Sequence, residues 1–266
     1  IVENNHFKNT QSECVFDKEG GEDNVYRRNI FENCAVALKI NNQGDNNGIQ
    51  NVRTKIYENI FNCKNSVGNE AVRMLSEPTD WEVYNNVGYE CDGLVVRSNS
   101  GPADGGIVYN NIWFGTTNRI MFESWNGDDR EPDYLDNNIY EPNARYYENR
   151  FSGSEKSYNS LNAWSSAVHP KIYDRNSKEL DPKFVNVNNN DFHLQSTSPG
   201  KLSGRFGLDI GAYPRNDNTV IGPRGTSFSN IPTTTSTTLL TITTTITSTT
   251  STTLPSSQYS CSNSMP

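Results

Sequence analysis

One short pattern recurs along the first half of the chain and constrains its fold more than any other feature. An Asn is followed by a bulky apolar residue and then by an aromatic or small one, as in "YENIFNC", "YNNVGYEC", "YNNIWFG" and "DNNIYEP". The marker residues lie 24 to 30 positions apart; they are Asn5, Asn29, Asn59, Asn86, Asn111 and Asn138. A constant short core at a loose period is typical of a solenoid whose connecting loops vary in length.

Each repeat reads as two strands and a polar loop. The first strand carries the marker; the second is "AVALKI" at 35–40, "AVRML" at 71–75, "GLVVR" at 93–97 and "RIMFE" at 119–123. Apolar stripes at helical spacing are missing, so a helical repeat is disfavoured. Coils stacked about 4.8 Å apart bury a continuous core that no single coil could bury alone. The sequence therefore predicts an all-β fold, a right-handed parallel β-helix over residues 1–150.

The recurring Asn has a structural explanation. At a turn between strands, its side-chain amide can bond to the Asn above and below, as Asn side chains do in stacked sheets. Asn also tolerates the left-handed backbone that a sharp bend needs. We therefore interpret the Asn column as a turn ladder and look for function elsewhere.

The period breaks near residue 150. Residues 151–214 contain "DPKFV", "DFHLQSTSPG" and "DIGAYP". These motifs resemble the C-terminal end of many bacterial right-handed parallel β-helix repeat proteins of the pectate-lyase-like superfold, and the resemblance covers roughly residues 1–214. An irregular segment that closes the last coil is also expected physically, because the end of a solenoid exposes core and unpaired strand edges.

The last part of the chain, residues 215–266, is a Thr/Ser-rich tail, with "IPTTTSTTLLTITTTITSTTSTTLPSSQ" at its centre. Such a segment has too little apolar surface to form a core, so we expect it to be disordered. It resembles the threonine stalks that tether extracellular domains. The chain starts at Ile1 and shows no signal peptide, so we read it as a mature or truncated fragment.

Charge and hydropathy exclude some partners. The net charge is −8, which argues against nucleic acid because phosphate binding needs a basic field. No apolar run is long enough to insert across a bilayer. We expect a monomer outside the cell or on its surface.

The five cysteines form no CxxC pair, and three histidines are too few for a zinc cluster. We expect mainly buried free thiols that pack as small apolar side chains, with one disulfide as the alternative in a secreted chain. We predict neither a thiol site nor a metal site from them.

The resemblance implies a range of activities, from polysaccharide lyases to non-catalytic surface proteins, and the fold does not choose among them. A lyase needs a cation that neutralises the sugar carboxylate and a base that takes the α-proton. Aligning Val36, Val72, Leu94 and Ile120 in register would put outward charges on one face. The candidate catalytic residues are then Lys39, Arg73, Arg97 and Glu123. The alternative is that these charges only keep the solenoid soluble.

A second candidate is the acidic loop "WNGDDREPDYLD". Trp125 could stack on a sugar, and paired carboxylates could hydrolyse a glycosidic bond. The Gly-His-Gly and Arg-Ile-Lys motifs of polygalacturonases are missing, so we do not carry over that family's roles. Asp128, Asp129 and Glu131 could instead bind Ca²⁺ or be plain solvated loop. No other cofactor is indicated.

Two functions follow. The first is an extracellular protein that binds or processes polysaccharide, with a lyase acting on acidic glycans as its sharpest form. The second is a non-catalytic adhesin or structural surface protein. The missing catalytic motifs and the Thr-rich stalk favour the second, and the resemblance favours the first.

Overall fold

The computed structural model describes eleven stretches of the chain. They are residues 1–18, 21–41, 52–66, 68–75, 78–98, 105–115, 119–124, 132–150, 154–167, 173–215 and 220–223. All of them lie in one compact unit, Ile1–Phe228. The boundaries at residues 150 and 214 stay predictions, and the Thr-rich part of the tail lies outside the described residues.

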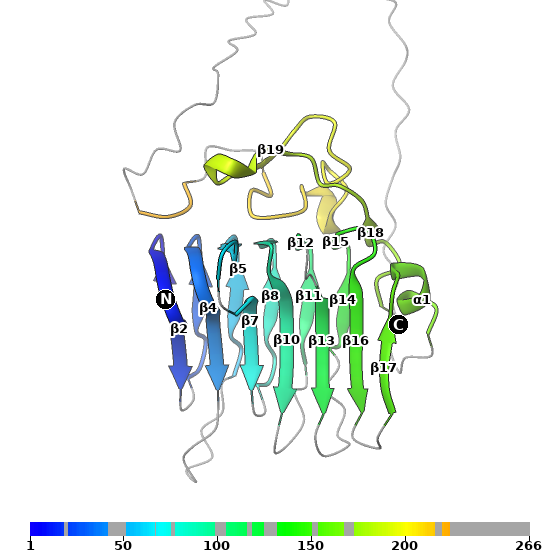
Figure 1. The fold of residues 1–266 in the computed structure, drawn as a ribbon, viewed down its shortest axis with the longest axis horizontal. Helices are drawn as coiled ribbons and strands as arrows, with labels where there is room; N and C mark the ends of the chain where they lie inside the picture. Colours follow the sequence, from blue (N-terminus) through cyan, green and yellow to red (C-terminus); the bar gives the residue numbers. More distant parts are fainter. Residues whose placement is uncertain are drawn as a thin grey trace, which may run out of the picture. The chain divides into compact units, whose positions relative to one another are not determined.

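Two sheets of stacked strands build the body of the molecule (Figure 1). The first sheet is parallel throughout, in the order β1 (Val2–Glu3), β3 (Val25–Arg27), β5 (Lys55–Tyr57), β8 (Glu82–Tyr84), β11 (Ile107–Tyr109) and β14 (Tyr134–Asp136). Each strand pairs with the equivalent strand of the next coil, which confirms the predicted parallel β-helix.

The second sheet covers two faces. One face holds short strands: β6 (Ile60–Asn62), β9 (Val87–Tyr89), β12 (Ile112–Phe114), β15 (Ile139–Tyr140) and β18 (Lys178–Glu179). The other holds β7 (Glu70–Leu75), β10 (Asp92–Ser98), β13 (Arg119–Ser124), β16 (Arg145–Arg150) and the antiparallel β17 (Ser154–Tyr158). The long strands β2 (His6–Lys18) and β4 (Ile30–Asn41) connect the faces, because β4 pairs with both β6 and β7.

The Asn ladder is present and runs through six coils. Each side-chain amide nitrogen donates to the carboxamide oxygen of the next Asn at 3.0 to 3.1 Å, from Asn5 through Asn29, Asn59, Asn86 and Asn111 to Asn138. Five of the six marker residues, Asn29, Asn59, Asn86, Asn111 and Asn138, are fully buried, so this column is a line of polar side chains inside the protein. The left-handed residue is the one before each marker; at Asn4, Arg28, Glu58, Asn85, Asn110 and Asn137, φ lies between 53° and 58°. The expectation that the ladder Asn itself takes that conformation was wrong.

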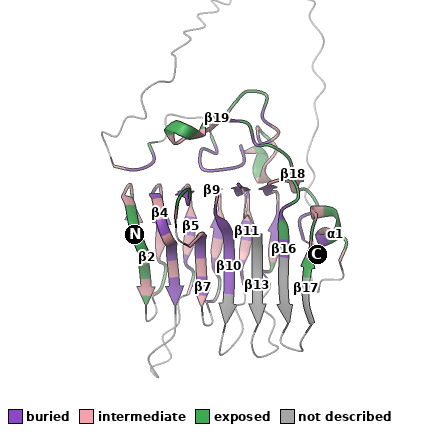
Figure 2. Ribbon diagram, in the orientation of Figure 1, coloured by how far each residue is buried: buried purple, intermediate pink, exposed green. Residues whose placement is uncertain are grey.

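The two residues after each marker lie on opposite sides of the sheet. Phe31, Phe61 and Trp113 pack in the interior of the β-helix. The preceding Ile or Val points outward into a second apolar cluster, which contains Ile30, Ile60, Val87, Ile112 and Ile139. Buried positions accordingly occupy both sides of the short strands and continue along β4 and β10 (Figure 2). The repeated motif therefore encodes a ladder residue, an outer apolar residue and an inner one.

Residues 178–215, here called the covering segment, bury that outer apolar column. The segment contains β19 (Phe184–Asn186), η1 (Val187–Asn189), β20 (Asp191–Leu194) and the 3-10 turn η2 (Arg205–Gly207). Phe184, Phe192 and Ile210 pack on the column. Asn62 donates to Asn190 at 2.6 Å, and Gly211 N donates to Asn110 O at 2.8 Å. The segment thus runs back along the side of the coils, whereas we expected it to close only their end.

The last coil is covered by β18 and the short helix α1 (Leu161–Ser165), whose Trp164 is fully buried against Tyr146 and Tyr173. Trp164 Nε1 donates to Asp174 Oδ2 at 2.8 Å, and Asn138 Nδ2 donates to Asp174 Oδ1 at 3.4 Å. The Asn ladder therefore ends on a buried carboxylate.

The cysteines correct another expectation. Cys14 is bonded to Cys34, and Cys63 to Cys91. Both disulfides join neighbouring coils, where stacking brings residues 20 and 28 positions apart together. The prediction of mainly free thiols was wrong because loop lengths hid this proximity. Cys261 lies outside the described residues.

Candidate functional site

The residues predicted for lyase chemistry lie on the long-strand face. Lys39 of β4 is directly in register with Arg73 of β7, because Leu38 pairs with Val72. We had aligned Val36 with Val72, so the assumed register was two residues off. A shift of two residues keeps each side chain on the same face, and Lys39 and Arg73 do lie on adjacent strands.

Both cations are already paired with protein carboxylates. Lys39 Nζ lies 2.8 Å from Glu13 Oε1 and 4.3 Å from the centre of the Phe16 ring. Hydrogen bonding from Lys39 lowers the pKa of Glu13 to about 2. The Arg73 guanidinium holds Glu70 with two nitrogens, one of them 2.6 Å from Oε1. Neither cation is free to receive a sugar carboxylate in this arrangement.

The other predicted residues are only partly placed. Arg97 of β10 pairs with Glu123 of β13 in the expected register, but their side chains lie outside the described residues. Trp125, Asp128, Asp129 and Glu131 also lie outside them. Within the described stretches, no group of three or more His, Cys, Asp or Glu side chains is arranged to hold a metal ion. The calcium site at the acidic loop therefore stays a prediction.

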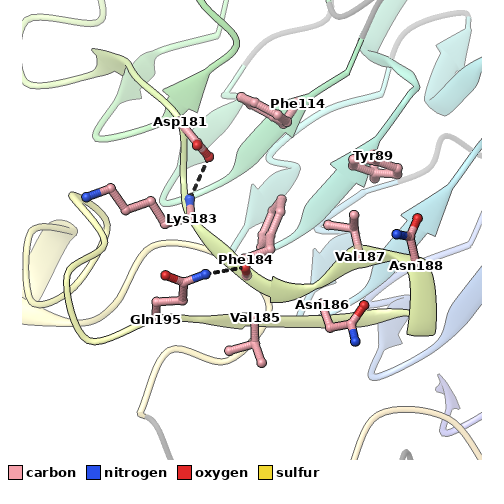
Figure 3. A pocket seen from close by; sticks show the side chains of 10 residues that line it. All are labelled: Tyr89, Phe114, Asp181, Lys183, Phe184, Val185, Asn186, Val187, Asn188 and Gln195. Carbon is pink, nitrogen blue, oxygen red and sulfur yellow. Dashed lines mark hydrogen bonds between the residues drawn. The ribbon is translucent and has the colours of Figure 1, made fainter.

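A hollow of about 470 Å³ opens on a different face, between the ends of β9 and β12 and the covering segment (Figure 3). Its lining consists of Tyr89, Phe114, Asp181, Lys183, Phe184, Val185, Asn186, Val187, Asn188 and Gln195. Tyr89 and Phe114 are in direct register on adjacent strands. The remaining lining residues all come from residues 181–195 of the covering segment.

The inner wall of the hollow is aromatic. Phe184 meets Phe114 edge to face, with ring centres 6.4 Å apart, and meets Phe192 in the same way at 5.2 Å. Phe192 in turn contacts Tyr89 at 5.5 Å. These contacts hold the rings in place, while Tyr89 and Phe114 stay partly exposed. The hollow thus presents preorganised aromatic surface to solvent.

The rim of the hollow is polar and rich in amides. Asn186, Asn188 and Gln195 are exposed at its edge. Gln195 Nε2 donates to Phe184 O at 2.9 Å, which orients its side chain (Figure 3). Lys183 N donates to Asp181 Oδ1 at 2.8 Å, and this bond shapes the turn into β19. A concave aromatic surface with a few oriented polar groups is the usual form of a small-ligand site.

Sequence reasoning missed this site. The third residues of β6, β9 and β12 are in register and are Asn62, Tyr89 and Phe114. Two aromatic residues at equivalent positions of adjacent repeats were therefore a usable signal. The second wall comes from a segment about a hundred residues further along the chain. Its return along the coils has no periodic signature, so the hollow could not be assembled from the repeats alone.

Comparison with protein-family models, with curated proteins and with solved structures finds no match for this chain. The helix found in the described stretches falls short of the length and apolar character needed to cross a bilayer. The chain is a parallel β-helix, and residues 178–215 cover part of its outer face.

Proposed function

We propose that the protein binds a polysaccharide outside the cell, with the hollow between the short strands and the covering segment as its binding site. The observation that carries this proposal is the pairing of partly exposed aromatic rings, Tyr89 and Phe114, with the amide side chains of the rim. Sugar rings have an apolar face that packs on aromatic carbon and hydroxyls that need hydrogen-bond partners. The hollow offers both kinds of contact within one site.

Two features support an extracellular location. The disulfides Cys14–Cys34 and Cys63–Cys91 are of the kind that form and persist in oxidising compartments. The Thr/Ser-rich composition of the tail suits an extended tether that holds the β-helix away from a surface. The disulfides are the stronger support, because a reducing cytosol would keep these thiols unpaired.

Binding without cleavage is the form of the function that the described residues favour. A lyase would require Lys39 or Arg73 to leave Glu13 or Glu70 and take up a uronide. Their salt bridges support a scaffold role instead. The lyase hypothesis keeps Arg97 and Glu123 as its remaining candidates, and an adhesin that recognises glycan without processing it accounts for the same site.

The test is a binding screen with immobilised neutral and acidic polysaccharides, using the full chain with its disulfides intact. We expect at least one polysaccharide to be retained. The variant Asn186→Ala/Asn188→Ala should weaken that binding at least tenfold, since the two exposed amides contribute hydrogen bonds and little to the fold. Asn189→Ala is the matched control: the residue is an exposed amide of the same turn that does not line the hollow.

Product release from uronides is followed in parallel by ultraviolet absorbance of unsaturated sugar ends. Binding with no such product supports the adhesin form. If unsaturated product forms in the wild type and Arg97→Ala abolishes it, the lyase hypothesis is supported. If wild type, the double variant and Asn189→Ala are retained equally on the immobilised polysaccharide, the binding site lies elsewhere and the hollow is excluded as the site.

A further inference from the structure

The charges around the hollow carry an inference about its ligand. Asp181 is exposed at the rim. Lys183 is the cation of the lining, but its side chain extends away from Tyr89 and Phe114, and its Nζ donates to Thr197 O at 3.2 Å (Figure 3). The ammonium group of Lys183 is therefore not directed at the aromatic wall.

Two further carboxylates lie next to the aromatic wall, outside the lining of the hollow itself. Glu90 follows Tyr89 directly, and Glu141 comes one residue after Tyr140, which pairs with Trp113; Glu141 therefore reaches the position beside Phe114. Glu90 N donates to Phe114 O at 2.7 Å, and Glu141 N donates to Trp113 O at 3.0 Å. Glu90 therefore lies on the coil of Tyr89, and Glu141 lies on the coil that follows the one of Phe114.

The electrostatics of this group agree with its geometry. Burial raises the pKa of Tyr89, and the negative charges of Glu90 and Glu141 raise it further. Burial also raises the pKa of Glu141; a hydrogen bond from the Gly115 backbone opposes this rise, and the charge of Glu90 adds to it. The charges of the two glutamates thus act on the Tyr89 side of the aromatic wall, in agreement with their positions on the neighbouring coils. A second negative charge brought into the hollow would meet the same repulsion.

Resting on the proposed function, we propose that the hollow is selective for neutral sugars and rejects uronides. Glu90, Glu141 and Asp181 would repel the carboxylate of a uronic acid. The same oxygens accept hydrogen bonds from the hydroxyls of an uncharged sugar, and bonds to an ionised acceptor are the stronger kind. Selectivity would thus come from like-charge exclusion added to aromatic packing. This assigns a ligand class opposite to the acidic glycan expected for a lyase.

The test compares each uronide polysaccharide with its own carboxyl-reduced form, so that linkage and chain length are matched. We expect wild-type protein to bind the reduced, neutral form at least tenfold more tightly at low ionic strength. The ratio of the affinity for the neutral form to the affinity for the uronide should fall as the salt concentration is raised, because screening weakens repulsion between exposed charges. Glu90→Gln/Glu141→Gln should narrow this affinity ratio at low salt, because the two charges that repel the uronide carboxylate are gone.

A charge-matched control separates local repulsion from the effect of net charge. Glu22→Gln/Asp23→Asn removes the same two charges at an exposed site that pairs with Arg53, and it should leave the ratio unchanged. Two results would overturn the proposed selectivity and leave polysaccharide binding intact. One is equal affinity for a uronide and its reduced form. The other is an affinity ratio that Glu22→Gln/Asp23→Asn narrows as much as Glu90→Gln/Glu141→Gln does. Absence of binding to every polysaccharide would overturn the proposed function itself.

Discussion

Asn59 donates its side-chain amide to the carboxamide oxygen of Asn86 at 3.0 Å, and its backbone N–H donates to the same oxygen at 3.0 Å. Asn86 also donates to Ile56 O, Tyr84 O and Asn111 Oδ1 at 2.9 to 3.0 Å. A single buried side chain thus satisfies polar groups of three successive coils. Its removal would leave several of them without a partner inside the protein.

We expect Asn86→Ala to lower the free energy of unfolding by about 3 to 5 kcal/mol, since each buried polar group left unpaired costs about 1 to 3 kcal/mol. Denaturant unfolding followed by circular dichroism measures this loss. Asn162→Ala, at an exposed position of α1, is the comparison and should change stability by less than about 0.5 kcal/mol. Equal effects of the two substitutions would contradict a stabilising role for the ladder.

The disulfide between Cys63 and Cys91 closes a loop of 28 positions. Replacing both residues by Ala should cost about 3 to 4 kcal/mol on the chain-entropy model, because the cross-link restricts the unfolded chain. Peptide mapping by mass spectrometry without reduction first establishes the pairing, and thermal unfolding of wild type and double variant then gives the loss. Free thiols at these positions in protein secreted through an oxidising compartment would refute the pairing.

The carboxyl group of Asp174 gives a pH dependence of unusual sign. Burial raises its pKa from 3.8 to about 6. Because the folded-state pKa is the higher one, the folded protein holds the proton more tightly, and this group destabilises the fold as pH rises from about 4 to 6. The full effect is about 3 kcal/mol, from about 1.4 kcal/mol for each pKa unit.

We therefore expect the stability difference between wild type and Asp174→Asn to shift by about 3 kcal/mol between pH 4 and pH 7, in the direction that weakens wild type at pH 7. Urea unfolding at a series of pH values measures it. The donors around the carboxylate, among them Tyr140 OH at 2.9 Å and Ser177 Oγ at 2.6 Å, oppose the effect of burial. A difference that does not vary with pH would show that those donors cancel the cost of burial.

Gly88 leaves room for an indole ring of the next coil. A Cβ at this position would lie 2.5 Å from Trp113 Cε3 and 2.7 Å from Cζ3, too close for two carbon atoms. Gly88→Ala should destabilise the protein by about 1 to 3 kcal/mol through overpacking. Adding Trp113→Phe should recover part of that loss, because the smaller ring gives back space, and comparison of the melting temperatures of both variants tests this. An additive loss in the double variant would argue against the steric explanation.

The coils could be predicted from the sequence because each one repeats the same physical problem. In each coil the Asn, such as Asn59, bonds to the Asn of the next coil, Phe61 packs in the interior and Ile60 packs under the covering segment. These requirements recur in every coil, so the sequence pattern repeats with the coil. The cover for Ile60 could not be predicted, because the side chains that supply it, such as Phe192, lie in a segment without repeats.

Prediction of the site was weaker than that of the fold. Lys39 and Arg73 were expected on the long-strand face, where they lie. The carboxylates that pair with them, Glu13 and Glu70, are not in the repeated motif. Tyr89 and Phe114 occupy equivalent positions in adjacent repeats, yet only the returning chain turns them into one wall of a hollow. Charge partners and fold-back contacts depend on side chains far apart in sequence, and periodicity does not report them.

The position of the covering segment sets an order of events during synthesis. Asn62 and Asn190 are bonded across 128 positions, so the coils leave the ribosome well before the chain that covers them. Until then the column of Ile30, Ile60, Val87, Ile112 and Ile139 faces water as an apolar stripe, which is the kind of surface that promotes aggregation. A chain that ends before Phe184 would lack the side chains that cover this column and would leave it exposed to solvent.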